Sequence, residues 1–214
     1  MTDLLVALAA VVPALFFGAG GVALLPTRSR MAGALMVVTA VGVITSAMLR
    51  LGGEADAARV LLVASLMLPG AMAMLAFPRA TFRHAVEFCA WIVVVGAGVV
   101  GTYYSLDSNV GLTGSLAAVT CIALIGHGWW VLETEGEEDR QAMLWLALAV
   151  IVTGSIYGLL LAQFQLPGVG AGGFVLSALG PAMAVGTRRP GITDIRALVV
   201  RSVVFGVVAI AYVA

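Results

Sequence analysis

Three ionisable side chains interrupt otherwise apolar stretches of this sequence: the acid Glu87, the titratable ring of His127 and the base Arg201. Ionisable groups within long apolar segments are expensive to bury and are therefore candidates for function. If they lie at similar depth, they form one buried polar cluster in which Glu87 and Arg201 are an ion pair. The alternative is that Glu87 and Arg201 each extend separately to the polar boundary. His127 stands between two glycines and is followed by two tryptophans, which also fits a packed ring rather than a haem or metal ligand.

A second polar set lies toward the opposite ends of the apolar segments. It consists of Tyr103, Tyr104, Tyr157 and Gln163. Aromatic rings with an amide partner suit an outer pocket for an unknown small or lipid-like ligand. Tyrosines at a membrane boundary also act as interfacial anchors, which is the alternative interpretation.

Motifs for enzymatic chemistry are missing from the sequence. No phosphate-binding loop, HExxH or GxSxG motif occurs, and no lysine is present to form a Schiff base. The two cysteines, Cys89 and Cys121, lack metal-ligand spacing, so buried free thiols are expected. We therefore predict a protein that is not an enzyme, without cofactor, metal or nucleic-acid partner.

Composition points to lipid as the main solvent. Of 214 residues, 62% are hydrophobic and 10% charged, against about 25% charged in ordinary soluble domains. The mean hydropathy is +1.10. Since a membrane span needs about 20 apolar residues of helix, the sequence predicts an all-α polytopic bundle of seven spans plus an eighth C-terminal helix. The predicted segments are 4–25, 31–49, 60–77, 85–104, 112–132, 142–164, 171–187 and 197–214.

The arginines predict the orientation, because short cytoplasmic loops retain basic residues. Connections after the odd-numbered spans hold most arginines, whereas the alternate connections hold only Arg50 and Arg59. We expect the amino terminus outside, in a multi-pass protein of a bacterial or archaeal plasma membrane. The expected division is a bundle over 1–187, a cytoplasmic basic hinge over 188–196 and the eighth helix over 197–214.

Local signals add detail to the bundle. Pro69-Gly70 and Gly180-Pro181 predict kinks in the third and seventh spans, which suggest a hinge or cavity. The alternative is that proline and glycine are simply commoner in membrane helices. Small residues, such as GAGG at 18–21, predict close helix contacts and allow a homodimer. The acidic connection ETEGEEDRQ at 133–141 predicts a solvated helix end, where the dipole of the sixth span favours negative charge.

The hinge contains Arg188, Arg189, a Pro-Gly turn, Asp194 and Arg196, and it leads into an apolar helix. This run, RRPGITDIRALVVRSVVFGVVAIAY, resembles the junction that follows the multi-span sensor region of bacterial membrane histidine kinases. The positions that match are Arg189, Asp194, Ile195, Arg196, Arg201, Val204 and Gly206. The resemblance covers roughly the last thirty residues and implies a two-component sensor or receptor. Kinase activity is not predicted, because the sequence holds neither a phosphoacceptor histidine box nor ATP-binding boxes.

Three functions fit these observations. The first is a sensory module that couples a ligand, lipid or membrane signal to a cytoplasmic effector, with the hinge transmitting the change. The second is an accessory subunit of a larger membrane complex, and the third is a small transporter whose path runs through the predicted polar cluster. All three have membrane lipids as partners.

Overall fold

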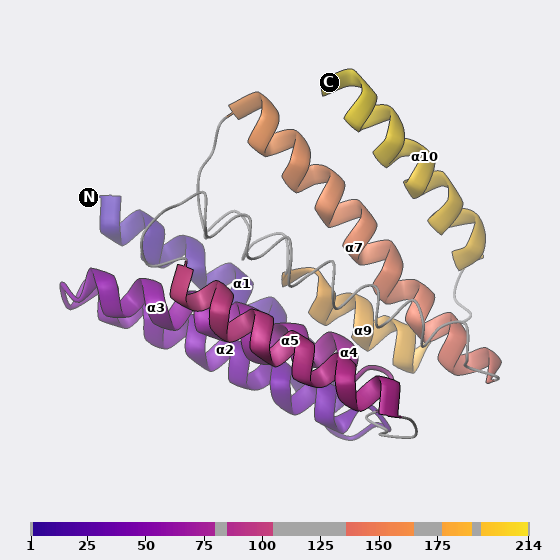
Figure 1. The fold of residues 1–214 in the computed structure, drawn as a ribbon, viewed down its shortest axis with the longest axis horizontal. Helices are drawn as coiled ribbons and strands as arrows, with labels where there is room; N and C mark the ends of the chain where they lie inside the picture. The colour runs from indigo at the N-terminus through magenta and orange to yellow at the C-terminus, as the bar shows by residue number, and fades with distance from the viewer. Residues whose placement is uncertain (1, 80–84, 105–135, 165–176, 190–193, 214) are drawn as a thin grey trace.

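The computed structural model describes residues 2–79, 85–104, 136–164, 177–189 and 194–213, and every regular element within them is a helix (Figure 1). This confirms the all-α class for that part of the chain. The elements, in chain order, are α1 (Thr2–Leu24), α2 (Arg30–Leu51), α3 (Ala55–Ser65), the π-helical turn η1 (Leu66–Gly70), α4 (Ala71–Leu75), α5 (Ala85–Tyr104), α7 (Glu137–Phe164), α9 (Leu179–Arg188) and α10 (Ile195–Val213).

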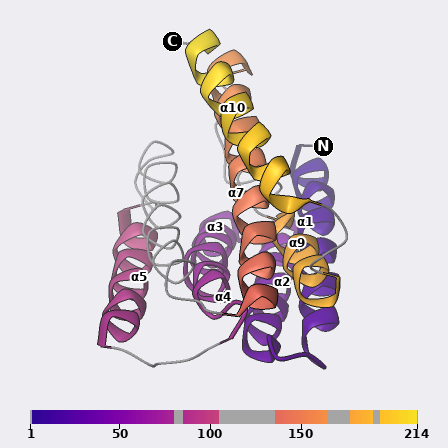
Figure 2. The same cartoon turned by 90° about the vertical axis from the view of Figure 1, so that its right-hand side faces the viewer.

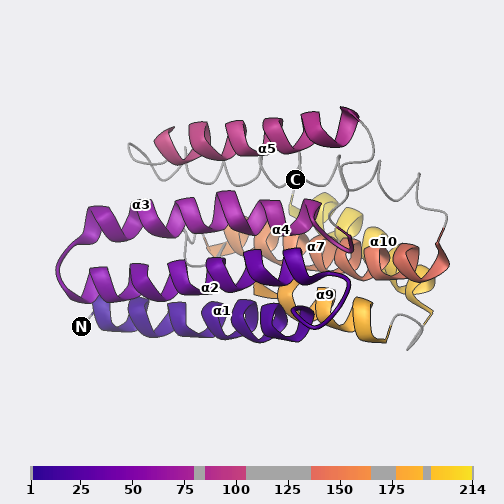
Figure 3. The ribbon, with the colours of Figure 1, turned by 90° about the horizontal axis from the view of Figure 1, so that it is seen from below.

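The helices pack side by side with their long axes roughly aligned over one half of the molecule (Figure 3). α1 packs against α2, and α2 packs against α3, η1 and α4, which in turn contact α5. On its other side α1 contacts α9, α9 contacts α7, and α10 packs against α7 (Figure 2). The largest fully buried side chains, including Phe17, Met36, Met74 and Met183, fill the space between these neighbours.

α2 shows how the sequence divides between the two faces of a helix. Its buried residues include small and hydroxyl side chains, such as Ala32, Gly33 and Thr39, beside the larger Met36 and Val43, whereas Val38 and Met48 are 56% and 67% exposed. In a protein surrounded by water, fewer large apolar side chains would be exposed along one helix. Small inward residues let helix backbones approach each other, as in membrane bundles.

Proline produces a local widening of the helix in the third apolar run. Pro69 has no backbone N–H to donate and its ring crowds the preceding turn. The chain forms the π-helical turn η1 between α3 and α4, and the three elements make up one helical stretch, Ala55–Leu75. The proline thus changes the helix type at Pro69-Gly70, while the predicted kink stays a prediction. At Gly180-Pro181, Ser177 is helical, Ala178 is a turn residue and α9 begins at Leu179, so Pro181 lies in the first turn of α9. Residues 165–176, which precede this turn, lie outside the described part of the chain, so the kink expected in the seventh span stays a prediction.

Glycines mark the closest helix contacts. At the crossing of α1 and α9, a Cβ built on Gly180 would lie 2.6 Å from the carbonyl oxygen of Phe16, and one built on Gly20 would clash with the Gly180 backbone. Between α1 and α2, a Cβ on Gly21 would lie 2.8 Å from the Gly33 oxygen. These contacts agree with the close packing predicted from GAGG at 18–21.

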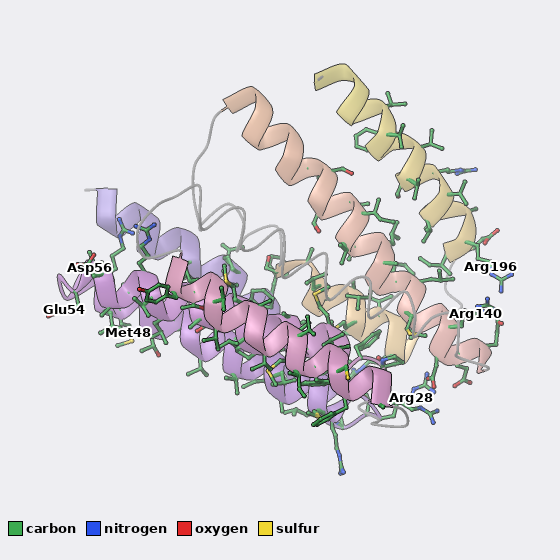
Figure 4. The ribbon with its side chains drawn as sticks, viewed as in Figure 1. Arg28, Met48, Glu54, Asp56, Arg140 and Arg196 are labelled. Atoms are coloured by element: carbon green, nitrogen blue, oxygen red, sulfur yellow. The ribbon has the colours of Figure 1, made fainter. Side chains whose placement is uncertain are left out.

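Charged residues gather at the two ends of the helices. Arg28, Arg140 and Arg196 lie at the end where α1 finishes and α7 and α10 begin, whereas Glu54 and Asp56 lie at the other end (Figure 4). The connections that follow the first, third, fifth and seventh predicted spans thus meet at one end, as the described portions 25–29, 76–79, 136–140 and 187–189 contact one another there. We call this end the arginine-rich end.

Within the described residues, two helical stretches are long and apolar enough to cross a membrane, Arg30–Leu51 and Ala55–Leu75. Ala10–Leu24 and Phe88–Tyr103 are shorter apolar helices. The bounds of α5 coincide with the predicted fourth run, 85–104, while the fifth run, 112–132, falls outside the described residues. The count of seven spans is therefore still a prediction.

Candidate functional site

Asp139, at the start of α7, is the centre of the contacts at the arginine-rich end. Its Oδ1 lies 2.8 Å from Nη2 of Arg28, and its Oδ2 lies 2.9 Å from Nε of Arg79. The Arg28 contact satisfies an ion-pair distance without the alignment of a directed hydrogen bond. Only 13% of the Asp139 side chain is exposed. One carboxylate thus joins the segment after α1, the segment after α4 and the first turn of α7.

The position of this carboxylate follows from the sequence of α7. Glu137, Glu138 and Asp139 occupy the first turn, where negative charge is favoured by the helix dipole. Glu138 is 77% exposed and lies 3.1 Å from Nη1 of Arg28. The predicted solvated helix end is therefore correct for Glu137 and Glu138 and wrong for Asp139, which two arginines cover.

The hinge pairs with the same turn of α7. Nη2 of Arg196, in the first turn of α10, lies 3.3 Å from Oε1 of Glu137. Both side chains are well exposed, at 64% and 60%, so this pair is worth only about 0–1 kcal/mol. Asp194 Oδ1 accepts a hydrogen bond from the Ala197 N–H at 3.3 Å and caps α10.

A hydrogen-bonded junction holds α9 to the same end. The Ser29 hydroxyl, which is buried, donates to the Pro78 carbonyl at 2.7 Å and lies 3.4 Å from the Thr187 hydroxyl. Nη2 of Arg188 donates to the Ala23 carbonyl at 3.0 Å, near the carboxyl end of α1. An arginine at this position also interacts favourably with the helix dipole. We define the site as these contacts together: the ion pairs of Arg28, Arg79 and Arg196 and the Ser29 junction.

The structure places two of the three members of the predicted polar cluster on helices with different neighbours. Glu87 belongs to α5, which packs on α3, η1 and α4, whereas Arg201 belongs to α10, which packs on α7. The Arg201 side chain is exposed. His127 lies outside the described residues, as does the side chain of Glu87. Their clustering is still a prediction.

The predicted outer pocket is described only in part. Tyr103, near the end of α5, is 68% exposed. The side chains of Tyr104, Tyr157 and Gln163 lie outside the described set, although their backbones belong to α5 and α7. Cys89 is a free, exposed thiol on α5, contrary to the expectation of burial. Among the described residues, no group of His, Cys, Asp or Glu could hold a metal ion.

Of the four hinge residues predicted from sequence, Arg188 and Arg196 make contacts to other helices and Asp194 caps α10. Arg189 is exposed at the end of α9. Sequence reasoning missed Arg28, Arg79 and Asp139 as members of the site. The available signal was that acidic residues and arginines all fall in connections assigned to one side. Comparisons with protein-family models, curated proteins and solved structures find no match.

Proposed function

We propose that this chain is an integral membrane protein with seven spans and an eighth helix, with its amino terminus outside. Large apolar side chains cover its sides, including Val22, Val41, Phe88 and Val207, each more than half exposed. α1, α7 and α10 have 23, 28 and 19 residues. At about 1.5 Å per residue they are about 28 to 42 Å long, comparable with a hydrocarbon core of about 30 Å. Arginines then place the arginine-rich end at the cytoplasm.

Within that membrane setting, we infer a sensory role in which packing changes among the helices reach a cytoplasmic effector through α10. The observation that supports it is the Arg196 to Glu137 ion pair, which ties the first turn of α10 to the first turn of α7. Two residues further along α7, Asp139 is held by Arg28 and Arg79. Movement of α7 would therefore displace α10, the segment after α1 and the segment after α4, which its first turn contacts.

The energies of these pairs suit a switch. An exposed pair worth about 0–1 kcal/mol can open when a signal favours another arrangement by a similar amount. A ligand shifts such an equilibrium only by binding the two arrangements unequally. The more buried pairs of Asp139 would keep the remaining helices in place while the Arg196 pair opens. The signal, whether a small ligand, a lipid or membrane stress, acts from the outer face or within the bundle.

The test is a complementation experiment in the native host. A deletion strain receives the wild-type chain, Arg196→Glu, the charge swap Glu137→Arg with Arg196→Glu, or the control Arg140→Gln. Arg140 is an exposed arginine on the same helical turn of α7, and the described residues offer it no ion-pair partner. At equal membrane abundance, Arg196→Glu should give a transcript profile different from that of the wild type, because its opened pair imitates the signalled arrangement, while the swap and the control restore the wild-type profile. A deletion that leaves every profile unchanged would refute the sensory role.

One observation favours a second function, an accessory subunit of a larger membrane complex. Among the described contacts α10 packs chiefly on α7, and it exposes Val200, Val204 and Phe205 by more than half of their surface. A partner protein of the same membrane, or a second copy of this chain, would cover such a helix as well as lipid does. Co-purification of a stoichiometric partner protein in mild detergent would support the accessory-subunit function, and purification without such a partner would favour the sensory role.

A further inference from the structure

Two short segments, far apart in the sequence, meet at the contact between Ser29 and Thr187. Their hydroxyl oxygens are 3.4 Å apart. The first segment reads Thr-Arg-Ser-Arg over 27–30, and the second reads Thr-Arg-Arg over 187–189. Four arginines are therefore carried by two segments that touch through their hydroxyl side chains. We call Arg28, Arg30, Arg188 and Arg189 the arginine cluster.

The described acids do not neutralise this cluster. Arg28 is paired with Glu138 and Asp139. Arg188 donates to a backbone carbonyl, which has no net charge to offset its own. Arg30 and Arg189 are exposed, and no described carboxylate lies within ion-pair distance of either. Three guanidinium groups thus keep donors available for an anion.

The surroundings of the cluster indicate which anion. Arg30 is the first residue of α2 and Arg188 the last of α9, so both lie where apolar helices meet the polar end. Exposed apolar side chains occur at the same end of the helices: Val22 and Leu25, at the end of α1, are 60% and 45% exposed, and Val185, one turn before Arg188, is 36% exposed. A phosphate beside the guanidinium groups would therefore have acyl chains beside apolar side chains. A free phosphate gains nothing from that second surface.

We propose that the arginine cluster binds the headgroup of an anionic phospholipid of the inner leaflet, with Arg30, Arg188 and Arg189 contacting the phosphate. The proposal rests on the membrane placement given under Proposed function, but not on the sensory role. Planar guanidinium groups suit phosphate because they donate two parallel hydrogen bonds. A bound lipid would hold the end of α9, and with it the start of the hinge, against the segment between α1 and α2.

The experiment measures lipid binding by native mass spectrometry of the full chain in detergent. Phosphatidylglycerol and phosphatidylcholine with the same acyl chains are titrated separately, and a further arm adds inorganic phosphate as competitor. The test variant is Arg30→Gln with Arg189→Gln. The control, Arg140→Gln with Arg201→Gln, removes the same charge from two exposed arginines outside the cluster.

The expected result is tighter binding of phosphatidylglycerol than of phosphatidylcholine by the wild type. Each cluster arginine near an anionic surface accounts for about a fivefold change in affinity, so the test variant should lose about 25-fold. The control variant should lose less than threefold, and phosphate at the lipid concentration should not compete. Equal losses in both variants, equal binding of the two lipids, or displacement by phosphate would each overturn the proposal. An unchanged melting temperature shows that the glutamine variant is folded. If it melts at a lower temperature, the variant Arg30→Lys with Arg189→Lys, which keeps both charges, replaces it and should retain part of the lipid binding.

Discussion

Replacing Asp139 by asparagine tests whether the arginine-rich end is held by this one carboxylate. Asparagine keeps the shape and removes the charge, so contacts to Arg28 and Arg79 lose their ionic part. Each partly buried, charge-assisted contact is worth about 1 kcal/mol after discounting for solvent. Loss of a charge favoured by the helix dipole adds about 0.5 kcal/mol. We therefore expect Asp139→Asn to lower the free energy of unfolding by about 2 to 3 kcal/mol.

The assay is reversible unfolding of the full chain in mixed micelles of mild detergent and dodecyl sulfate. The matched control is Glu138→Gln, one residue away, whose side chain is 77% exposed and, among the described residues, pairs with Arg28. A surface pair of this kind should contribute less than about 0.5 kcal/mol. A double-mutant cycle of Asp139→Asn with Arg79→Gln should give a coupling energy of about 1 kcal/mol, because the two groups are 2.9 Å apart.

Salt separates the two carboxylates further. Raising the ionic strength to about 1 M shortens the screening length to about 3 Å and should abolish the Glu138 effect, whereas the covered Asp139 pairs should persist in part. If Asp139→Asn and Glu138→Gln destabilise the chain equally, or if the cycle gives no coupling energy, the reasoning from burial is refuted.

Three further predictions concern the packing and the orientation of the helices. Gly180→Ala places a Cβ within 2.6 Å of a backbone oxygen of α1 and should destabilise the bundle by about 1 to 3 kcal/mol. Gly96→Ala is the control and should not destabilise it, because a Cβ at position 96 has no neighbouring atom within 4 Å; thermal melts compare the two variants. In a chain without its native cysteines, cysteines introduced at Ser155 and Gly206 should form a disulfide on mild oxidation, because a Cβ at position 206 lies 2.9 Å from the Ser155 hydroxyl. The disulfide is detected as faster migration on a non-reducing gel, and unchanged migration would contradict the packing of α10 on α7. In the same background, Glu54→Cys should react with a membrane-impermeant thiol reagent added to intact cells, and labelling only after lysis would reverse the proposed orientation.

Local sequence predicted the helices well where a single physical rule decides them. Lipid offers no hydrogen-bond partners to the backbone, so a long apolar run in lipid pairs its own N–H and C=O groups by forming a helix. α5 illustrates this, since its ends coincide with a run bounded by polar connections on both sides. Pro69 illustrates the same point for a change of helix type, because the missing N–H acts on the preceding turn whatever lies nearby.

Gly180 shows where local rules were insufficient. A Cβ at this position would lie 2.6 Å from the carbonyl oxygen of Phe16 on α1, so only glycine fits the contact without a shift. The sequence of α9 alone does not contain this contact.

The sequence by itself determined that the described chain is helical and that most of its charges lie near the ends of apolar segments. These properties depend on neighbours within one or two helical turns. Only the tertiary structure decided that Asp139, and not Glu138, is the carboxylate covered by Arg28 and Arg79. An ion pair depends on the distance between two residues that are far apart in the sequence, as Arg28 and Asp139 are, and that distance is fixed by how helices pack rather than by the residues beside each charge.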